Sequence, residues 1–121
     1  MDMQTVAALF TLFSGQEDTQ TYAPFLTGAV QEVTQSLREG ADVTDPRLCY
    51  LAAAIANLRY MQTDAAPALA TYAGTVQVAA DWSGRCDLAE GLARGYRSLC
   101  RDLLQDAAFV FLTVGGCGDV Q

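Results

Sequence analysis

The sequence has no histidine and no lysine, so its seven basic residues are all arginines. Without histidine there is no Ser-His or Cys-His nucleophile pair, no imidazole general base and no histidine-containing zinc site. Without lysine there is neither a Schiff base nor a phosphate-loop lysine. We therefore expect a protein that is not an enzyme and that holds no cofactor and no metal.

The charge balance and the apolar content narrow the class of protein further. A net charge of -7 disfavours specific nucleic-acid binding, because contacts with phosphates depend on clustered cations. An apolar content of 51% excludes a disordered chain, and no apolar run approaches the roughly 20 residues that a membrane-spanning helix needs. The first residues lack a basic region followed by a long apolar stretch, so no secretory signal is indicated. We expect a soluble intracellular protein without a membrane partner.

Four cysteines stand at positions 49, 86, 100 and 117, and no two of them form a C-x-x-C pair. This spacing offers neither a metal knuckle nor a redox motif. We expect all four thiols to be reduced. Cys49, Cys86 and Cys100 fall in helical patterns, where a thiol acts as a small apolar filler, and Cys117 is expected to be exposed.

Apolar spacing predicts the first two helices. The stripe from Thr5 to Phe13 indicates a short helix that stops at Ser14-Gly15. The second helix is expected to run from a cap at Asp18 or Thr19 to Gly40, with Pro24 tolerated near its start.

The third predicted helix has the clearest start and the most apolar surface. Asp45 is a suitable cap, Pro46 suits the first helical position, and the pattern continues to about Thr63. Nearly every face of this segment is apolar, which is typical of a central helix, and its many alanines would let neighbouring helices approach closely.

The remaining elements include a fourth helix and two extended segments. Alternation at 72–79 predicts a short β-strand or extended arm, and Asp81 or Ser83 is expected to cap a long helix after it. In that helix the expected buried stripe is Ala89, Leu92, Ala93, Tyr96, Leu99, Cys100 and Leu103, widened by Leu88 and Leu104. The spacing of Gly91 and Gly95 fits either a close helix contact or two surface glycines.

The predicted architecture is thus mainly α: a compact bundle of about four helices, with the arm at 72–79 and a C-terminal strand at 109–114. Residues 1–114 are expected to form a single helical domain, since 121 residues suit one domain, and 115–121 a flexible glycine-rich tail.

Two sets of residues are candidate subunit or partner contacts. The first is an arginine row on the last helix, which suits an acidic partner surface or a solvated face: Arg94, Arg97 and Arg101. The second is the apolar terminal strand, which requires cover from this molecule or from another subunit: Phe109, Phe111, Leu112 and Val114.

Other candidate chemical sites are weaker. Asp42 and Asp45 are acidic neighbours, but spacing alone does not show the convergence that a Mg²⁺ site requires. Trp82 suits a ligand platform, although a lone tryptophan at a helix start is more often a packing residue. The glycines at 115–118 are not a phosphate loop, because neither a lysine nor a helix accompanies them.

Several stretches of the chain resemble a known family over roughly residues 15–114. These stretches are Tyr22–Leu26, Leu37–Asp42, Asp45–Ala54, Ala73–Val78 and Leu103–Phe111. They resemble head-to-tail connector (adaptor) proteins of tailed bacteriophages, encoded in prophages of Gram-positive bacteria. The resemblance implies a non-catalytic subunit that assembles with itself into a ring, located in the virion or in the cytoplasm of the bacterial host. Its implied partners are the portal and the tail-completion proteins.

Two other functions are compatible with the sequence. One is a small helical ligand-binding or regulatory module without catalytic activity, in which the third helix and Trp82 line a pocket. The other is an enzyme that uses carboxylates and arginine alone, which would depend on Asp42 or Asp45.

Overall fold

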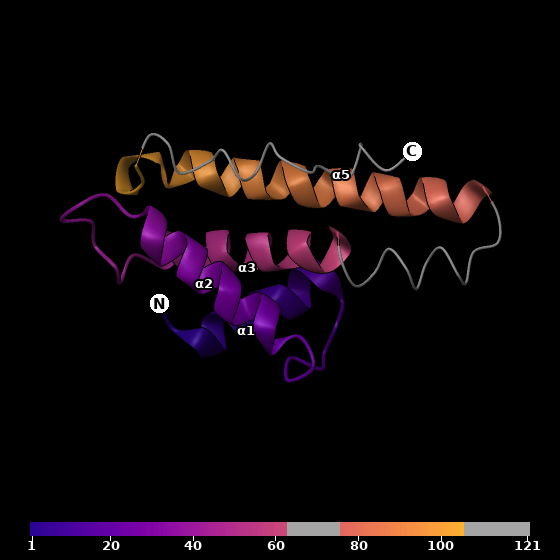
Figure 1. Ribbon diagram of the computed structural model, residues 1–121, viewed down its shortest axis with the longest axis horizontal. Coiled ribbons are helices and arrows are strands. Elements are labelled where there is room, and N and C mark those ends of the chain that lie inside the picture. Colours follow the sequence, from indigo (N-terminus) through magenta and orange to yellow (C-terminus); the bar gives the residue numbers. More distant parts are fainter. Residues whose placement is uncertain (63–75, 106–121) are drawn as a thin grey trace.

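The computed structural model describes residues 1–62 and 76–105, which form four α-helices and one short 3₁₀-helix (Figure 1). These elements are α1 (Met3–Ser14), α2 (Ala23–Ser36), α3 (Pro46–Tyr60), α5 (Val76–Leu99) and η2 (Arg101–Leu103). The prediction of a mainly α-helical bundle of about four helices is confirmed.

Helix α3 is the centre of the bundle. It packs against α1, α2 and α5, and Figure 1 shows α5 lying along one side of α3 with α1 and α2 on the other. Every residue of α3 from Leu51 to Leu58 is buried, including the alanines at 52, 53, 54 and 56. The predicted central helix is confirmed, because a helix contacted from several sides has no face left for polar residues.

The ends of α1 and α3 follow local rules that the sequence makes visible. Asp45 accepts a hydrogen bond from the backbone N–H of Arg47 and Pro46 occupies the first turn of α3, as predicted. Gly15 ends α1 with a φ of 78°, in the left-handed region that glycine tolerates best. Helix α1 begins earlier than predicted, because Asp2 caps it by accepting a hydrogen bond from the N–H of Gln4.

Helix α2 is shorter than predicted at both ends. Asp18 accepts hydrogen bonds from the backbone N–H and the hydroxyl of Thr21, so it stabilises a turn before the helix. A start at Thr19 would place Pro24 inside the helix, where proline removes a hydrogen bond and clashes with the preceding turn, so α2 begins at Ala23 instead.

The C-terminal end of α2 is set by a contact distant in sequence. Leu37 turns to an extended conformation and forms an isolated antiparallel bridge with Leu104. The N–H of Gln105 donates to the Ser36 carbonyl at 2.9 Å, and the N–H of Arg38 donates to the Leu103 carbonyl at 2.9 Å. This pairing ends the helix four residues before the predicted Gly40.

The predicted extended arm at 72–79 is wrong for residues 76–79, which form the first turn of α5. The caps predicted at Asp81 and Ser83 are also wrong, since both residues lie inside α5. The alternation around Val76 and Val78 covers only a few residues, so it favours a strand weakly. Extending an existing helix adds one hydrogen bond per residue, and this favours the helix. Residues 72–75, the predicted strand at 109–114 and the glycine-rich tail at 115–121 lie outside the described residues.

The cysteines are only partly as predicted. Cys49 and Cys100 are free and buried, and burial raises the pKa of the Cys100 thiol to about 11, so this thiol stays protonated. Cys86 is buried but takes part in a disulfide bond, so the prediction of a reduced thiol is wrong there. Cysteine spacing along the sequence does not reveal pairs that only the fold brings together.

No helix in the described ranges is both long enough and apolar enough to cross a bilayer.

Candidate functional site: the open face of α5

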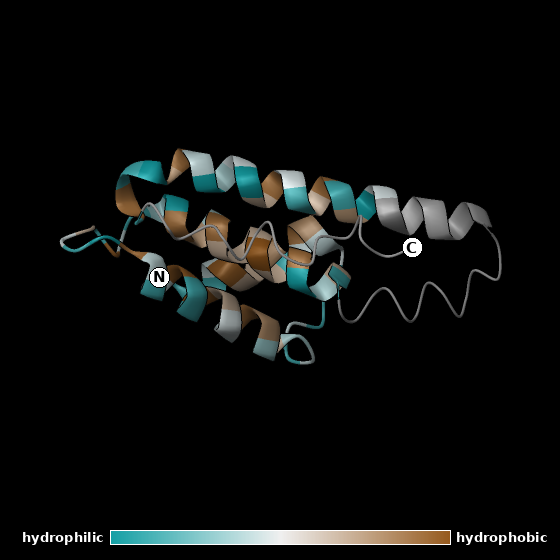
Figure 2. Ribbon diagram, turned by 45° about the horizontal axis from the view of Figure 1, so that its top comes forward, coloured by the Kyte–Doolittle hydropathy of each residue, from teal (hydrophilic) through white to brown (hydrophobic). Residues whose placement is uncertain are grey.

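One side of α5 has no other described element over it. We define the open face of α5 as Leu88, Gly91, Gly95 and Leu99, whose spacing places them on one side of the helix. Leu88 is 75% exposed and Leu99 is 57% exposed, although both were predicted to belong to the buried stripe. In Figure 2, the coloured part of α5 shows hydrophilic and hydrophobic residues in alternation.

The glycines of this face are surface glycines and make no close helix contact. A Cβ atom built at Gly91 or at Gly95 would meet no atom within 4 Å. Each glycine costs about 1 kcal/mol of helix propensity relative to alanine. The two glycines leave the backbone of α5 accessible to a closely approaching partner.

The arginine row lies along one flank of α5 and continues into η2. Arg94 is exposed and pairs with Glu90 at 2.7 Å, an i,i+4 pair of the kind that adds little stability. Partial burial lowers the pKa of Arg97, and the neighbouring charges of Arg94 and Arg101 act in the same direction. Arg101 is exposed in η2. Three cations gathered in this way favour an anionic neighbour.

The predicted contacts at Phe109, Phe111, Leu112 and Val114 lie beyond the described residues. Of the seven predicted contact residues, the structure therefore places only the three arginines, and it places them near one another.

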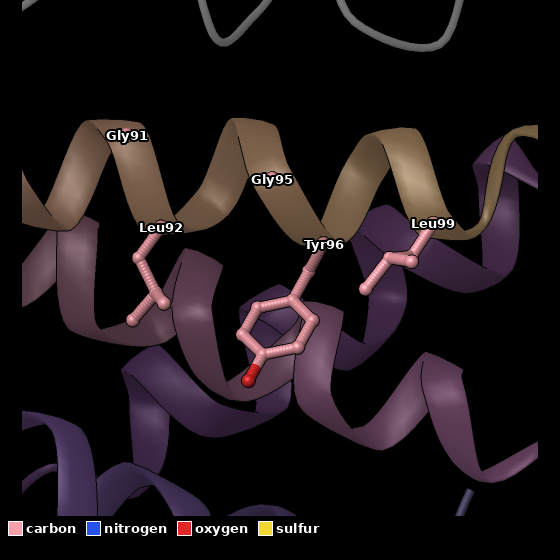
Figure 3. Close-up of a pocket in the computed structure, with 5 residues that line it drawn as sticks. All are labelled: Gly91, Leu92, Gly95, Tyr96 and Leu99. Atoms are coloured by element: carbon pink, nitrogen blue, oxygen red, sulfur yellow. The ribbon is translucent and has the colours of Figure 1, made fainter.

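Two hollows lie beside Leu92, at the border between the open face of α5 and the side that packs on α3. The first has a volume of about 320 Å³ and is lined by the residues that Figure 3 labels: Gly91, Leu92, Gly95, Tyr96 and Leu99. The second has a volume of about 300 Å³ and is lined by Phe13, Asn57, Met61, Arg85, Leu88, Ala89 and Leu92.

Aromatic rings from α1, α3 and α5 pack together beside these hollows. The ring of Tyr96 lies 5.4 Å from that of Tyr50 and 5.9 Å from that of Phe13, measured between centroids. These separations are typical of favourable aromatic pairs. In Figure 3 the side chain of Tyr96 points from α5 toward α3. The flank is therefore built from three helices and is fixed by ring packing.

A polar network joins the start of α3 to the end of α5. The guanidinium of Arg47 donates to Asp45 at 2.8 Å, to Asp102 at 3.0 Å and to the Leu99 carbonyl at 2.6 Å. The hydrogen bonds from Arg47 lower the pKa of both Asp45 and Asp102 below the ordinary aspartate value. Cations near a helix C-terminus also satisfy its free carbonyls, as Arg47 does at Leu99.

Replacement of Arg47 by methionine is expected to lower stability at neutral pH and to lower it less in acid. The pKa values of Asp45 and Asp102 are depressed in the folded state, so their stabilisation is present above the ordinary value of 3.8 and is lost as the pH falls through the depressed values. Thermal unfolding of wild type and Arg47→Met at pH 7 and near pH 3 measures the difference in stability between the two proteins at each pH. Arg94→Met is the matched control. A stability difference between wild type and Arg47→Met that is equal at both pH values would contradict the role of Arg47 in stabilising the two ionised aspartates.

Among the described residues, Asp42 and Asp45 bind neighbouring protein groups and do not gather with a third metal ligand. Asp42 accepts hydrogen bonds from the hydroxyl and the N–H of Thr44, at 2.6 and 2.9 Å, while Asp45 caps α3 and binds Arg47. Within residues 1–62 and 76–105, no three metal-ligating side chains gather in one place. The side chain of Trp82 lies outside the described residues.

Sequence reasoning missed two features of this region. Asn57 is the one strongly polar residue between Leu51 and Leu58, and this exception within an apolar helix is the signal that identifies it. The Arg47 network joins residues more than 50 positions apart, so no local sequence pattern predicts it.

Comparisons of the chain with family models, with curated proteins and with solved structures found no match.

Proposed function

We propose that the protein is a structural subunit of a bacteriophage or prophage head-to-tail connector, which assembles as a ring between the portal and the tail. The observation that carries the proposal is the open face of α5, where Leu88 and Leu99 are exposed beside two glycines. Exposed apolar side chains that share one face are typical of an interaction surface.

The arrangement of this face suits contact between copies of the chain. A ring forms when one surface of a subunit meets a different surface of the next and the rotation closes. The open face of α5 is one such surface, and the apolar segment containing Phe109, Phe111, Leu112 and Val114 is a suitable second one. Specificity between neighbours would come from Arg94, Arg97 and Arg101 meeting acidic groups, of which this chain of net charge -7 has an excess.

The proposed partners are other copies of the chain, the portal and the tail-completion proteins, in the virion or in the host cytoplasm. The sequence resemblance to connector proteins supports this choice of partners. The acidic net charge also suits a channel through which DNA passes without specific binding.

Aspartate at both Leu88 and Leu99 is expected to abolish assembly while leaving the fold intact. Both side chains are more than half exposed, so the monomer tolerates the change, but an unpaired charge buried in an interface would weaken association at least about a hundredfold. Light scattering after size exclusion measures the mass. Leu12→Asp is the matched control, since Leu12 is 74% exposed on α1. An oligomer that survives the double substitution would contradict this use of α5.

A helical ligand-binding module without catalytic activity is the second candidate, and the hollow at Asn57 favours it.

A further inference from the structure

Cys86 is the one described cysteine that forms a disulfide bond, since Cys49 and Cys100 are free. The bond lies within a single copy of the chain, because the structure holds one copy. The sequence has four cysteines, and the fourth is Cys117. Elimination therefore leaves Cys117 as the partner of Cys86.

This pairing fixes the direction of the chain that follows η2. The chain leaves η2 close to the end of α2, where the N–H of Gln105 donates to the Ser36 carbonyl at 2.9 Å. Cys86 lies roughly 20 Å away along the axis of α5 from Leu99, at a rise of about 1.5 Å per residue. The chain after Gln105 must therefore return along α5 to bring Cys117 to Cys86.

The returning chain is long enough for this path. An extended chain covers about 3.3 Å per residue, so the stretch from Gln105 to Cys117 spans at most about 40 Å. A disulfide holds the two Cα atoms within about 7 Å of each other. The apolar segment from Phe109 to Val114 covers about 20 Å when extended, so it lies alongside α5 between the two fixed ends.

Cys86 also selects the side of α5 along which this chain returns. Helical spacing places Cys86 on the same flank as Glu90 and Arg97, and away from Leu99 on the open face. The charged side chain of Glu90 is 16% exposed, whereas Leu99 is 57% exposed. Greater burial of a charged group than of a leucine fits a covering chain on the flank of Cys86.

We propose that a disulfide between Cys86 and Cys117 ties the segment from Phe109 to Val114 to the flank of its own α5, and that reduction releases the segment for contact with a neighbouring copy. While it is tied, the segment does not reach the open face of another subunit. The bond therefore makes assembly depend on the redox conditions. This last step rests on the proposed connector function.

The reductant that releases the segment is a dithiol. One of its thiolates attacks one sulfur of the bond, and the other sulfur leaves as a thiolate and takes up a proton. The second thiol of the reductant then displaces the protein. Two electrons and two protons pass to the protein, which ends with two thiols, and the reductant ends with a disulfide. Since the reduced chain is the form that assembles, the solution masses that test the connector proposal are measured with reductant present.

Peptide mapping of the full chain, equilibrated in a glutathione redox buffer, tests the pairing. Free thiols are alkylated in denaturant before digestion with trypsin, which cuts after arginine and here separates all four cysteines. The four cysteine-containing peptides are Leu48–Arg59, Cys86–Arg94, Ser98–Arg101 and Asp102–Gln121. We expect the second and the fourth of these peptides to be linked, in protein that is monomeric without reductant. Alkylation of both peptides, or linkage of either to a different peptide, would overturn the inference.

Thermal unfolding measures whether the bond constrains the folded chain. A disulfide that closes a loop of about 30 residues is expected to raise the unfolding midpoint by roughly 10 °C. Dithiothreitol removes this increase from wild type. In Cys117→Ser the increase is absent with and without dithiothreitol, whereas the matched control Cys49→Ala keeps it. A midpoint that dithiothreitol leaves unchanged in wild type would contradict the tie.

Light scattering separates failure of this inference from failure of the connector proposal. We expect the oxidised chain to be monomeric, and both the reduced chain and Cys117→Ser to associate. Linked peptides together with a reduced chain that stays monomeric would contradict the connector function while supporting the disulfide. Oligomers that form equally in oxidised, linked protein would overturn the redox control and leave the connector function in place.

Discussion

Replacement of Phe10 by alanine is expected to destabilise the protein by about 3–5 kcal/mol, the usual cost of removing a fully buried large aromatic side chain. Phe10 is 0% exposed, and its ring lies 5.9 Å from that of Tyr22 and 6.1 Å from that of Tyr60. The substitution therefore opens a cavity where α1 meets α3 and the start of α2. Chemical denaturation of the two proteins measures the difference in the free energy of unfolding.

Leu12→Ala is the control for this prediction. Leu12 lies on the same helix, but its side chain is exposed, so its removal is expected to change stability by less than about 0.5 kcal/mol. Equal costs at the two positions would mean that α1 does not pack on α3 through Phe10.

The second large effect is expected from adding volume to the centre of α3. Ala53→Leu is expected to destabilise the fold by about 1–3 kcal/mol, because three additional carbons enter a close-packed site and force neighbouring side chains from their rotamers. Ala53 is fully buried in a helix that packs against α1, α2 and α5. Denaturant unfolding again measures the change.

The same substitution at Ala8, an exposed position of α1, is the matched control. Leucine and alanine are both good helix formers, so Ala8→Leu is expected to be nearly neutral. An Ala53→Leu variant that is as stable as wild type would show that α3 has free space around it and is not the centre of the bundle.

The central helix could be predicted because its signals are local. Asp45 and Pro46 mark its start, and an apolar pattern on all sides marks its burial. The stop at Gly15 is likewise visible, since a left-handed turn after a helix favours glycine. These features depend only on residues within a few positions of one another.

The boundaries that could not be predicted depend on tertiary contacts. The end of α2 at Ser36 is fixed by pairing with Leu103, Leu104 and Gln105, residues that are distant in the sequence. The apolar period of α5 also does not reveal how many helices will cover it. Leu88 and Leu99 match the buried stripe, yet α5 packs mainly on α3 and leaves them exposed.

The candidate sites also include one that local sequence patterns predict and one that depends on tertiary contacts. The arginine row follows from helical spacing, so Arg94 and Arg97 could be predicted to share a region. The hollow at Asn57 could not, because it exists only where α1, α3 and α5 meet. An asparagine in an apolar helix signals a buried polar group, but the sequence does not show whether another side chain satisfies it.

The most direct test of the connector proposal is the solution mass of the full chain and of a chain that ends at Asp106, measured by size exclusion with light scattering over a wide concentration range. The proposal predicts that the full chain forms a closed oligomer of one defined mass, and that removal of the segment containing Phe109 to Val114 abolishes it. A full chain and a shortened chain that are both monomeric and equally stable at every concentration would contradict it.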